Sequence, residues 1–234
     1  MELCILIPAK NEEGALNETI LNIHKKLSNI IPFNILVIND HSDDQTESIL
    51  SNLSKTIANL SYINNGFDNG VGNAIKFGLE SWKGDIVVIC MADASDSPND
   101  ILVSYNKLID GNYDCIFGSR FISGSSVKKY PIIKLILNRL FNNIVIFISK
   151  NKYNDFTNIF KMYSRKAIIE IRPIESTGFS IGLEMSLKVF SSKMKIGYIP
   201  ISWKQRTSGK SKLNLVKNIR LYVSTLVRCV KYDK

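Results

Sequence analysis

Short apolar runs alternate with amphipathic segments through the first half of this chain, and this alternation limits the possible folds more than any other feature. Leu3 to Ile7 and Ile35 to Ile38 are apolar throughout, as strands buried on both faces are. Residues 13–30 between them have the spacing of an amphipathic helix that ends before Pro32. Further strands are predicted near residue 62, at 86–90 and at 114–118, each after a predicted helix. Strands that alternate with helices predict a single, mostly parallel α/β sheet flanked by helices.

Carboxylates follow directly after one of the predicted buried strands. The apolar run Ile86 to Cys90 is followed by Asp93, Ser95 and Asp96. Open α/β sheets bind ligands at the carboxyl ends of their strands. Mg²⁺ and Mn²⁺ take oxygen ligands there, usually one or two carboxylates together with phosphate oxygens of a substrate. We therefore predict Asp93 as a metal ligand with Ser95 and Asp96 nearby; the alternative is that Asp93 only caps the following turn.

Three polar clusters, at residues 8–12, 39–46 and 91–98, follow successive predicted strands and should meet at one edge of the sheet. In the first two clusters, the carboxylates of Glu12 and Asp40 could accept hydrogen bonds from a nucleobase or a ribose. The loop Asn69 to Gly72 lets backbone approach a ligand closely, because glycine has no Cβ. The loop is not a dinucleotide fingerprint, since position 75 is Ile and the first turn, PAKNEE, holds no glycine. The pattern therefore argues against NAD.

Composition predicts one enzyme-sized domain in a reducing compartment. The 234 residues are 45% hydrophobic, which is enough for a substantial core without disulfides. The four cysteines lie far apart without C-x-x-C spacing, as expected of reduced thiols in the cytoplasm. The start, MELCILIPAKNEE, lacks the pattern of a signal peptide. No stretch has eighteen uninterrupted apolar residues, so we do not expect a membrane-spanning helix.

The positive charge gathers near the C-terminus. Of the net charge of +9, residues 193–234 supply eleven Lys or Arg against one acid, so residues 1–192 are close to neutral. Charge alone does not choose between nucleic acid, anionic lipid and a phosphorylated substrate. In residues 213–234, however, the basic residues are interleaved with apolar ones at helical spacing. This predicts an amphipathic helix in a membrane interface, following a domain of residues 1–212; the alternative is a helix docked on its own domain.

A second candidate for membrane contact is the apolar stretch Ile132 to Ser149. Polar residues interrupt this stretch at Lys134, Asn138, Arg139, Asn142 and Asn143, so it is poorly suited to cross a bilayer. As an interfacial helix it would turn these residues toward lipid headgroups. The alternative is a helix of the protein core.

Seven motifs in order along the chain resemble those of family 2 glycosyltransferases of the GT-A fold, and specifically the dolichyl-phosphate mannosyltransferase type. They are IPAKNE, VINDHSDDQT, NGVGNA, MADASDSP, FGSRF, DFTNIFKMYSR and PISWKQRTSGKSKL. The resemblance implies a nucleotide-sugar-binding fold with a Rossmann-like sheet. It also implies metal-assisted transfer of a hexose, with inversion, from a GDP- or UDP-sugar to a polyprenyl phosphate. The reaction would take place on the cytoplasmic face of a membrane, and no nucleic-acid partner is expected.

The resemblance also assigns roles to residues. The donor-binding set is Pro8, Asn11, Glu12, Asp40, Gly70, Gly72 and Asp93. The metal ligands would be Asp93 and Ser95, and the acceptor would meet Arg120, Lys134 and Arg139. Arg206 and Lys212 would contact the phosphates of donor and acceptor, and they complete a catalytic set with Asp93 and Asp155.

The chain departs from the family pattern at several of these motifs. Met91 stands where the family's D-x-D motif has its first carboxylate, Asn39 replaces an aspartate and Lys10 a tyrosine. His41 replaces a glycine, and Lys134 and Lys161 stand where arginines are usual. Lysine keeps the charge of arginine but loses the bidentate fork that suits phosphate. The departures leave the fold prediction unchanged and bear on the substrate.

Three functions remain open from the sequence. A phosphate monoester is largely ionised at neutral pH, its second pKa being about 6, so a polyprenyl phosphate needs orientation and charge shielding more than a base. A sugar hydroxyl in a lipid-linked or capsular glycan would need a base, for which Asp155 and Glu184 are candidates. Their alternative roles are a helix cap for Asp155 and a solvated helix position for Glu184. Met91 suggests a third function, that of a catalytically silent module that binds sugar nucleotides.

Overall fold

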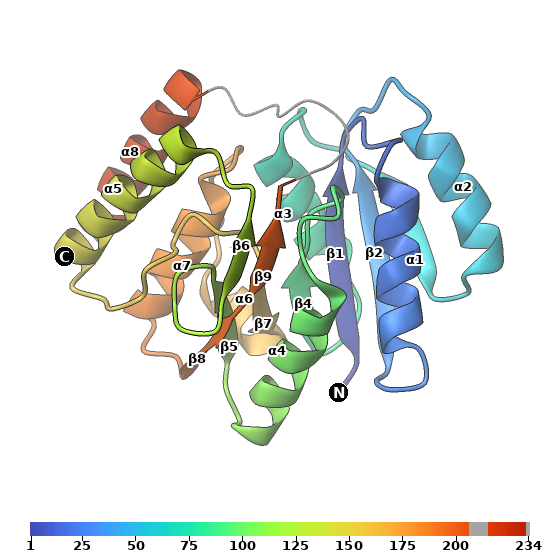
Figure 1. Ribbon diagram of the computed structural model, residues 1–234, viewed down its shortest axis with the longest axis horizontal. Helices are drawn as coiled ribbons and strands as arrows, with labels where there is room; N and C mark the ends of the chain where they lie inside the picture. Colours follow the sequence, from blue (N-terminus) through green and yellow to red (C-terminus); the bar gives the residue numbers. More distant parts are fainter. Residues whose placement is uncertain (206–214, 233–234) are drawn as a thin grey trace.

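A seven-stranded sheet forms the centre of the protein, whose computed structural model describes residues 1–205 and 215–232 (Figure 1). The strand order is β3-β2-β1-β4-β7-β5-β8, and β7 runs antiparallel to both of its neighbours while the other pairs are parallel. The strands are β1 (Leu3–Ala9), β2 (Phe33–Asn39), β3 (Leu60–Asn64), β4 (Ile86–Ile89), β5 (Cys115–Ser119), β7 (Lys161–Ser164) and β8 (Ile196–Pro200). The mostly parallel α/β sheet predicted from the sequence is confirmed.

Helices cover both faces of this sheet. They are α1 (Leu16–Leu27), α2 (Thr46–Thr56), α3 (Val71–Ser81), α4 (Pro98–Asp110), α5 (Ile132–Ser149), α6 (Arg165–Glu170), α7 (Ile181–Ser191) and α8 (Leu215–Tyr232). A small parallel pair, β6 (Ser126–Lys128) and β9 (Ser202–Lys204), lies outside the main sheet. α1 is shorter than predicted because the chain turns after Leu27, where Asn29 adopts a left-handed conformation with φ of 62°.

The core divides into two layers because successive side chains of a strand point to opposite faces. On β1, Cys4 and Leu6 join α3, α6 and α7 on one face, while Leu3, Ile5 and Ile7 join α1 and α4 on the other. Every residue of β1 is buried, which explains its uninterrupted apolar run. All four cysteines are buried free thiols, and burial raises the pKa of Cys4 to about 12. The sheet is thus held by apolar packing and main-chain hydrogen bonds, without a disulfide between these cysteines.

Strand register brings the three polar clusters level with one another. Leu3 pairs with Phe33 on one side and with Ile86 on the other, so β1, β2 and β4 begin together. Ala9 pairs with Asn39, so both of these strands also end together. The polar residues after each strand therefore meet at one edge of the sheet.

Helix α5 differs from the sequence-based expectation in the direction that its polar residues face. Asn142 is fully buried, and its amide oxygen accepts the backbone N–H of Phe156 at 2.7 Å. Arg139 donates to the backbone oxygen of Asn154 at 2.8 Å. These side chains point to the domain, not to headgroups, because they satisfy polar groups of the loop before β7. By length and composition α5 could cross a membrane, with a mean hydropathy of 1.6, which the sequence prediction did not allow.

Candidate functional site

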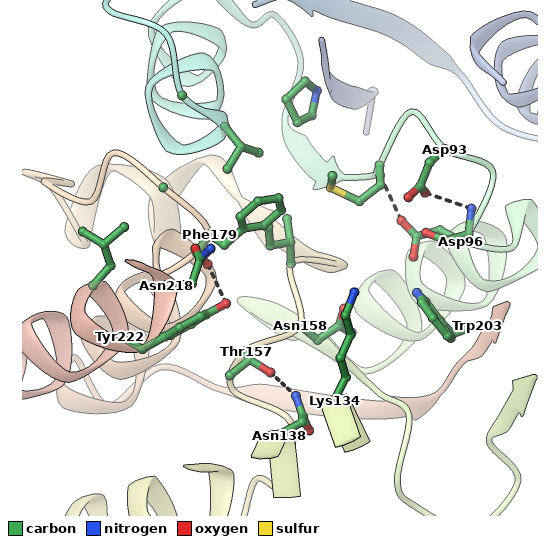
Figure 2. A pocket seen from close by; sticks show the side chains of 18 of the residues that line it. Asp93, Asp96, Lys134, Asn138, Thr157, Asn158, Phe179, Trp203, Asn218 and Tyr222 are labelled. Carbon is green, nitrogen blue, oxygen red and sulfur yellow. Dashed lines mark hydrogen bonds between the residues drawn. The ribbon is translucent and has the colours of Figure 1, made fainter. Parts of the chain in front are cut away.

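A cavity of about 700 Å³ opens at the carboxyl edge of the sheet (Figure 2). One wall comes from the strand-end clusters, with Pro8 at the end of β1, Asp40 after β2 and Asp93 after β4. The facing wall comes from α5, α8 and the loop before α7, and includes Lys134, Phe179 and Tyr222. The predicted meeting of the strand-end clusters is therefore observed, and the second half of the chain closes the site.

Asp40 organises the glycine loop. Its carboxylate accepts the Gly70 N–H at 3.0 Å and the Asn65 side-chain amide at 2.8 Å. Gly70 has a φ of 154°, and a Cβ there would lie 2.6 Å from the Thr177 carbonyl oxygen. A Cβ on Gly72 would lie 2.5 Å from the Thr177 carbonyl carbon. The glycines thus allow close packing of the loop on backbone near Thr177, and of the two only Gly70 lines the cavity.

The first turn is tied to the second strand end by Asn11. Its side-chain oxygen accepts the Asp43 N–H at 3.0 Å, and its amide donates to the Asp43 carboxylate. Its own N–H donates to Ser42 Oγ at 3.0 Å. Asn11 does not line the cavity, whereas Pro8, Lys10 and Glu12 of the same turn do. Asn11 therefore shapes the donor side indirectly.

The predicted metal ligands lie in a tight turn after β4. Asp93 is largely buried, and its Oδ1 accepts the Ser95 N–H at 3.1 Å; both residues line the cavity. Asp96 lies beside them, and its carboxylate accepts the Met91 N–H at 2.9 Å (Figure 2). Burial raises the pKa of Asp96 to about 7, and the charge of Asp93 contributes to the rise. Two neighbouring carboxylates in a half-enclosed site fit the charge of a divalent cation.

The chemistry of the donor set also fits a hard cation, because Asp93, Ser95 and Asp96 offer only oxygen atoms. Within residues 1–205 and 215–232, no group of three or more His, Cys, Asp or Glu side chains is placed to hold a metal. A cation here would therefore complete its coordination with oxygens of a bound diphosphate or with water, as Mg²⁺ commonly does.

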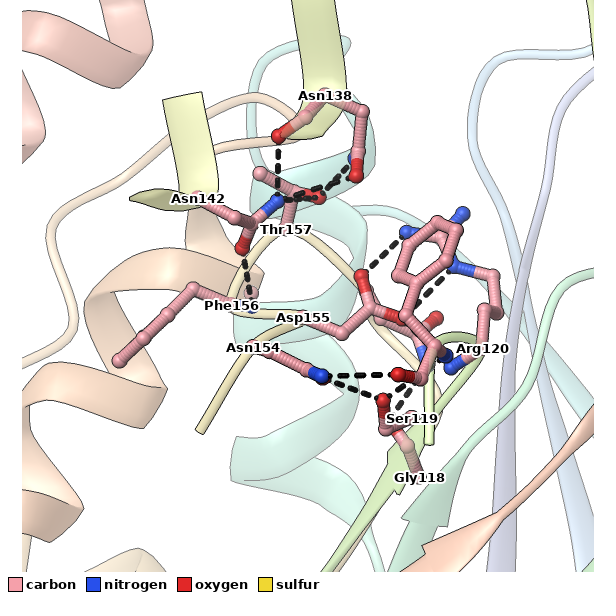
Figure 3. Close-up of polar contacts among 12 residues, drawn as sticks. Gly118, Ser119, Arg120, Asn138, Asn142, Asn154, Asp155, Phe156 and Thr157 are labelled. Carbon is pink, nitrogen blue, oxygen red and sulfur yellow. Dashed lines mark hydrogen bonds and ion pairs between the residues drawn. The ribbon is translucent and has the colours of Figure 1, made fainter. Parts of the chain in front are cut away.

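Arg120 enters the cavity wall as half of a buried ion pair with Asp155 (Figure 3). The guanidinium contacts both carboxylate oxygens, Nη2 to Oδ1 at 2.6 Å and Nε to Oδ2 at 2.8 Å. Burial alone would lower the pKa of Arg120, but the charge and hydrogen bonds of Asp155 raise it above its usual value. Asp155 is 0% exposed and does not line the cavity. Asp155 therefore lies away from the cavity with its oxygens engaged by Arg120, and the residues that follow it form no helix for it to cap.

Of the predicted acceptor residues, Arg120 and Lys134 line the cavity and Arg139 does not. Lys134 lines the cavity, next to Asn138, whose amide donates to Thr157 Oγ1 at 2.7 Å (Figure 2). Arg139 does not line it; its guanidinium lies over the Phe121 ring, 4.4 Å from the centroid. Lys134 and Arg120 therefore present positive charge to a ligand, and Arg139 supports the wall behind them. The predicted residues Arg206 and Lys212 lie outside the described residues.

Glu184 is buried, contrary to the expectation of a solvated helix position. Its carboxylate pairs with Lys188 at 3.1 Å and with Arg228 at 2.9 Å. It also accepts the backbone N–H groups of Glu175 and Ser176, at 2.9 and 2.7 Å. Burial alone would raise the pKa of Glu184, but these hydrogen bonds lower it overall. Glu184 is therefore a fixed anion between α7 and α8 and not a base facing the cavity.

Several residues of the site could not be found from the sequence. Tyr130 and Trp203 line the cavity with ring centroids 4.8 Å apart, Phe179 comes from the loop before α7, and Tyr222 from the apolar pattern of α8. Lys161 is fully buried behind the site and donates to the backbone oxygens of Phe156 and Asn158. Burial lowers the pKa of Lys161 to about 7. The weak sequence signal for Trp203 was its place in the PISWKQ motif.

Comparison with known proteins agrees with this geometry. The family model for glycosyl transferase family 2 matches residues 4–172. The chain is 24% identical over 217 residues to the polyprenol monophosphomannose synthase of Mycolicibacterium smegmatis, covering 90% of this chain and 80% of that protein. The crystal structure of glucosyl-3-phosphoglycerate synthase from Mycobacterium tuberculosis with Mn²⁺, UDP and phosphoglyceric acid is 15% identical, with a TM-score of 0.76. The match covers 98% of this chain and 78% of that one.

Proposed function

This chain belongs to glycosyl transferase family 2, and we propose that it transfers a hexose from a nucleoside-diphosphate sugar to a polyprenyl phosphate. The donor would be a GDP- or UDP-sugar, and the cofactor Mg²⁺ or Mn²⁺. The acceptor oxygen would attack the anomeric carbon from the side opposite the diphosphate, which inverts the configuration. The protein would act at the cytoplasmic face of a membrane, bound to its surface.

The observation that carries this proposal is the lining of the cavity. It combines the strand-end carboxylates, the cations Arg120 and Lys134, and apolar residues of two helices. These apolar residues are Leu137 and Phe141 on α5 and Ile219 and Tyr222 on α8. A ligand with a phosphate head and an apolar tail would find both cationic and apolar surface in this cavity.

The outward face of α5 supports a membrane surface as the place of the reaction. Ile133 and Ile136 are 71% and 60% exposed, and Leu140, Ile144, Phe147 and Ile148 continue the same helical stripe. Exposed apolar stripes of this length are unusual on proteins that do not contact lipid or another protein. Because Arg139 and Asn142 bind the loop before β7, α5 is held along the domain and presents this stripe sideways to a membrane. α8 lies beside α5, with the Phe141 and Tyr222 rings 5.3 Å apart (Figure 1).

The residues of the site suit a phosphate acceptor. A divalent cation bound at Asp93 would offset the charge that develops on the diphosphate leaving group. Arg120, held rigid by Asp155, and Lys134 would orient the acceptor phosphate and shield its charge. Such a phosphate brings its own ionised oxygen, so no base is needed. Both base candidates predicted from the sequence, Asp155 and Glu184, are engaged in buried ion pairs.

One observation favours a second candidate, transfer to a sugar hydroxyl. Asp96 faces the cavity with a pKa raised to about 7 by burial, a value suited to a general base near neutral pH. If the acceptor were a hydroxyl, Asp96→Asn would lower kcat by roughly 10² to 10⁴. With a phosphate acceptor the same change would leave kcat within about tenfold, since only the charge near the cation site changes.

The proposal is tested with the purified full chain, a panel of GDP- and UDP-hexoses and Mg²⁺ or Mn²⁺. The acceptors are a short polyprenyl phosphate, the matching polyprenol and a glycan with free hydroxyls. We expect product with the polyprenyl phosphate only. Transfer to the glycan would establish the second candidate. Nucleotide binding without transfer to any acceptor would establish a silent binding module, which Met91 suggests.

Membrane association is tested separately by sedimentation with anionic vesicles. We expect binding at low salt and release as salt rises, because charge attraction is screened. Ile136→Glu on α5 should weaken binding strongly. Val103→Glu is the matched control, because Val103 is 42% exposed on α4, which contributes no residue to the cavity. Equal loss of binding in both variants would contradict the assignment of α5 to the membrane.

A further inference from the structure

The inner face of α8 is joined to a loop of the cavity by a row of polar contacts. We call residues 175–179 the donor-side loop, because this part of the facing wall packs on Gly70 and Gly72 at Thr177, and Thr177, Gly178 and Phe179 line the cavity. Tyr222 donates its hydroxyl to the Phe179 carbonyl at 3.1 Å. One turn further along α8, Thr225 contacts Ser176 Oγ at 3.3 Å. Arg228 donates to the same Ser176 hydroxyl at 3.2 Å. One side of this loop is therefore held by α8.

The other side of the donor-side loop rests on the glycine turn that opens α3. The Gly72 N–H donates to the Thr177 carbonyl at 3.0 Å. A Cβ on Gly72 would lie only 2.6 Å from the Ser176 oxygen and 2.7 Å from the Gly178 nitrogen. Backbone packed this closely cannot shift without moving its neighbour. The position of the donor-side loop therefore fixes the glycine turn, whose Gly70 N–H is bound by Asp40.

Glu184 connects these contacts at one buried anion. It receives two backbone N–H groups from the donor-side loop, and it pairs with Arg228 of α8 and Lys188 of its own helix. If α8 moved away, Glu184 would lose Arg228 and keep Lys188 as the remaining one of its two cationic partners. A partly compensated buried carboxylate is costly, so the bound position of the loop and the docked position of α8 favour each other.

The outward face of α8 carries a stripe that complements the one on α5. Ile219, Val223 and Val227, each nearly half exposed, follow one another at intervals of one helical turn. A flat surface that binds the stripes of α5 and α8 together stabilises the docked state of α8, because only that state places them side by side.

From these contacts we propose that Arg228 and Glu184 are positioning residues of the donor pocket, and that binding of a lipid surface to α5 and α8 raises the affinity for nucleotide. The proposal rests on the proposed function in taking the ligand to be a nucleotide and the surface to be a membrane. By linkage, nucleotide raises the affinity for the lipid surface by the same factor. Neither effect depends on the nature of the acceptor.

The experiment measures the Kd of UDP and of GDP with Mn²⁺ by calorimetry, with and without vesicles of equimolar phosphatidylcholine and phosphatidylglycerol. The vesicles contain no polyprenyl phosphate. We expect vesicles to lower the Kd of the wild-type protein by about fivefold or more, a coupling at the low end of the usual range. In Arg228→Gln the decrease should fall to less than about twofold, while Arg228→Lys should recover part of it.

The matched control is Arg220→Gln. Arg220 lies on an exposed position of the same helix, so this change removes the same charge without touching the donor-side loop. Arg220→Gln should weaken sedimentation with vesicles about as much as Arg228→Gln does. Vesicles should nevertheless still lower its Kd for nucleotide, as they do in the wild type. Should Arg228→Gln fail to fold, as judged by circular dichroism, Tyr222→Phe removes a contact with the same loop and should also reduce the decrease.

An unchanged Kd in wild-type protein that sediments with vesicles would overturn the proposal. A decrease in Arg228→Gln equal to that of the wild type would also overturn it. Failure of the proposed function is detected by a different measurement, the transfer of a hexose to polyprenyl phosphate in detergent. That reaction can be measured without vesicles, so its outcome does not depend on any effect of vesicles on the Kd. Absence of nucleotide binding or of sedimentation in the wild type would overturn both.

Discussion

The two halves of the site are built on different principles. On the donor side, Pro8 lies at the end of β1 while Asp40 and Asp93 follow β2 and β4, and the register of the sheet brings them together. Arg120, although it follows β5 directly, takes the position of its guanidinium from Asp155, 35 residues away, and behind the facing wall Arg228 pairs with Glu184, 44 residues away. The donor side is therefore fixed by backbone, and the facing side by buried charges.

This difference teaches where substitutions should act. A side chain at a strand end can be changed without loss of the sheet, because its neighbours are held by apolar packing and main-chain bonds. A member of a buried ion pair cannot, because its partner remains as an uncompensated charge. Substitutions on the donor side should therefore change ligand binding or catalysis without changing stability, whereas substitutions on the facing side should change both.

The largest effect on stability is expected for Asp155→Asn. Arg120 would keep its charge in a buried site without a counterion, at a cost of about 3–5 kcal/mol in the free energy of unfolding. Asp155→Asn with Arg120→Gln should recover part of this loss. Lys166→Met, which breaks an exposed ion pair with Asp114, should cost less than about 1 kcal/mol. Urea unfolding monitored by circular dichroism measures all three, and equal costs for the buried and exposed pairs would remove the distinction between the halves.

On the donor side, Asp93→Ala should abolish catalysis and spare the fold. We expect at least roughly 100-fold lower metal-dependent turnover, because the cation loses its best carboxylate ligand. The free energy of unfolding should change by less than about 1 kcal/mol, since the hydrogen bond that Asp93 accepts from the Ser95 N–H closes a local turn. Met91→Asp should preserve or improve turnover. Full activity of Asp93→Ala at saturating Mn²⁺ would remove Asp93 from the metal site.

The same contrast explains what could be predicted from the sequence. Apolar runs and strand ends are local patterns, so the sheet, the order of its elements and the donor wall followed from them. The antiparallel β7 and the pairs Asp155–Arg120 and Glu184–Arg228 depend on contacts between distant segments, which leave no local spacing. The expectation that the polar residues of α5 face lipid headgroups was wrong for Arg139 and Asn142 for the same reason. A helical pattern shows which residues share a face, but it does not show what that face contacts.

Gly72→Ala tests the point at which the two halves touch. The added Cβ would meet backbone atoms near Thr177 at 2.5–2.7 Å, and we expect a loss of about 1–3 kcal/mol together with weaker nucleotide binding. Gly178→Ala is the matched control, because its nearest neighbour is the flexible Leu221 side chain at 3.2 Å. Thermal unfolding and nucleotide titration measure both variants. Tolerance of alanine at both positions would mean that the halves are not packed as closely as described.

The smallest effect concerns pH and the carboxylates at the end of β4. Burial raises the pKa of Asp96 from 3.8 to about 7, so the folded protein holds this proton more tightly than the unfolded chain. The stability gained in this way is fully present below about pH 4 and is lost as pH rises through 7. Asp96→Asn cannot ionise, and its side-chain oxygen can still accept the Met91 N–H. The variant should therefore gain stability relative to the wild type as pH rises.

We expect this gain, measured between about pH 5 and pH 8 without divalent cation, to be on the order of 1 kcal/mol, because the cavity admits water to the carboxylate. Comparing variant with wild type at each pH cancels the opposite contribution of Lys161, whose pKa is lowered to about 7. Asp110→Asn, at the exposed end of α4, should show no such trend. Mn²⁺ with UDP should reduce the trend, since a cation near Asp93 favours the ionised form of Asp96. The measured quantity is the difference in Tm between Asp96→Asn and the wild type. If this difference stayed constant with pH, or if its change with pH became larger with Mn²⁺, the cation would lie away from these carboxylates.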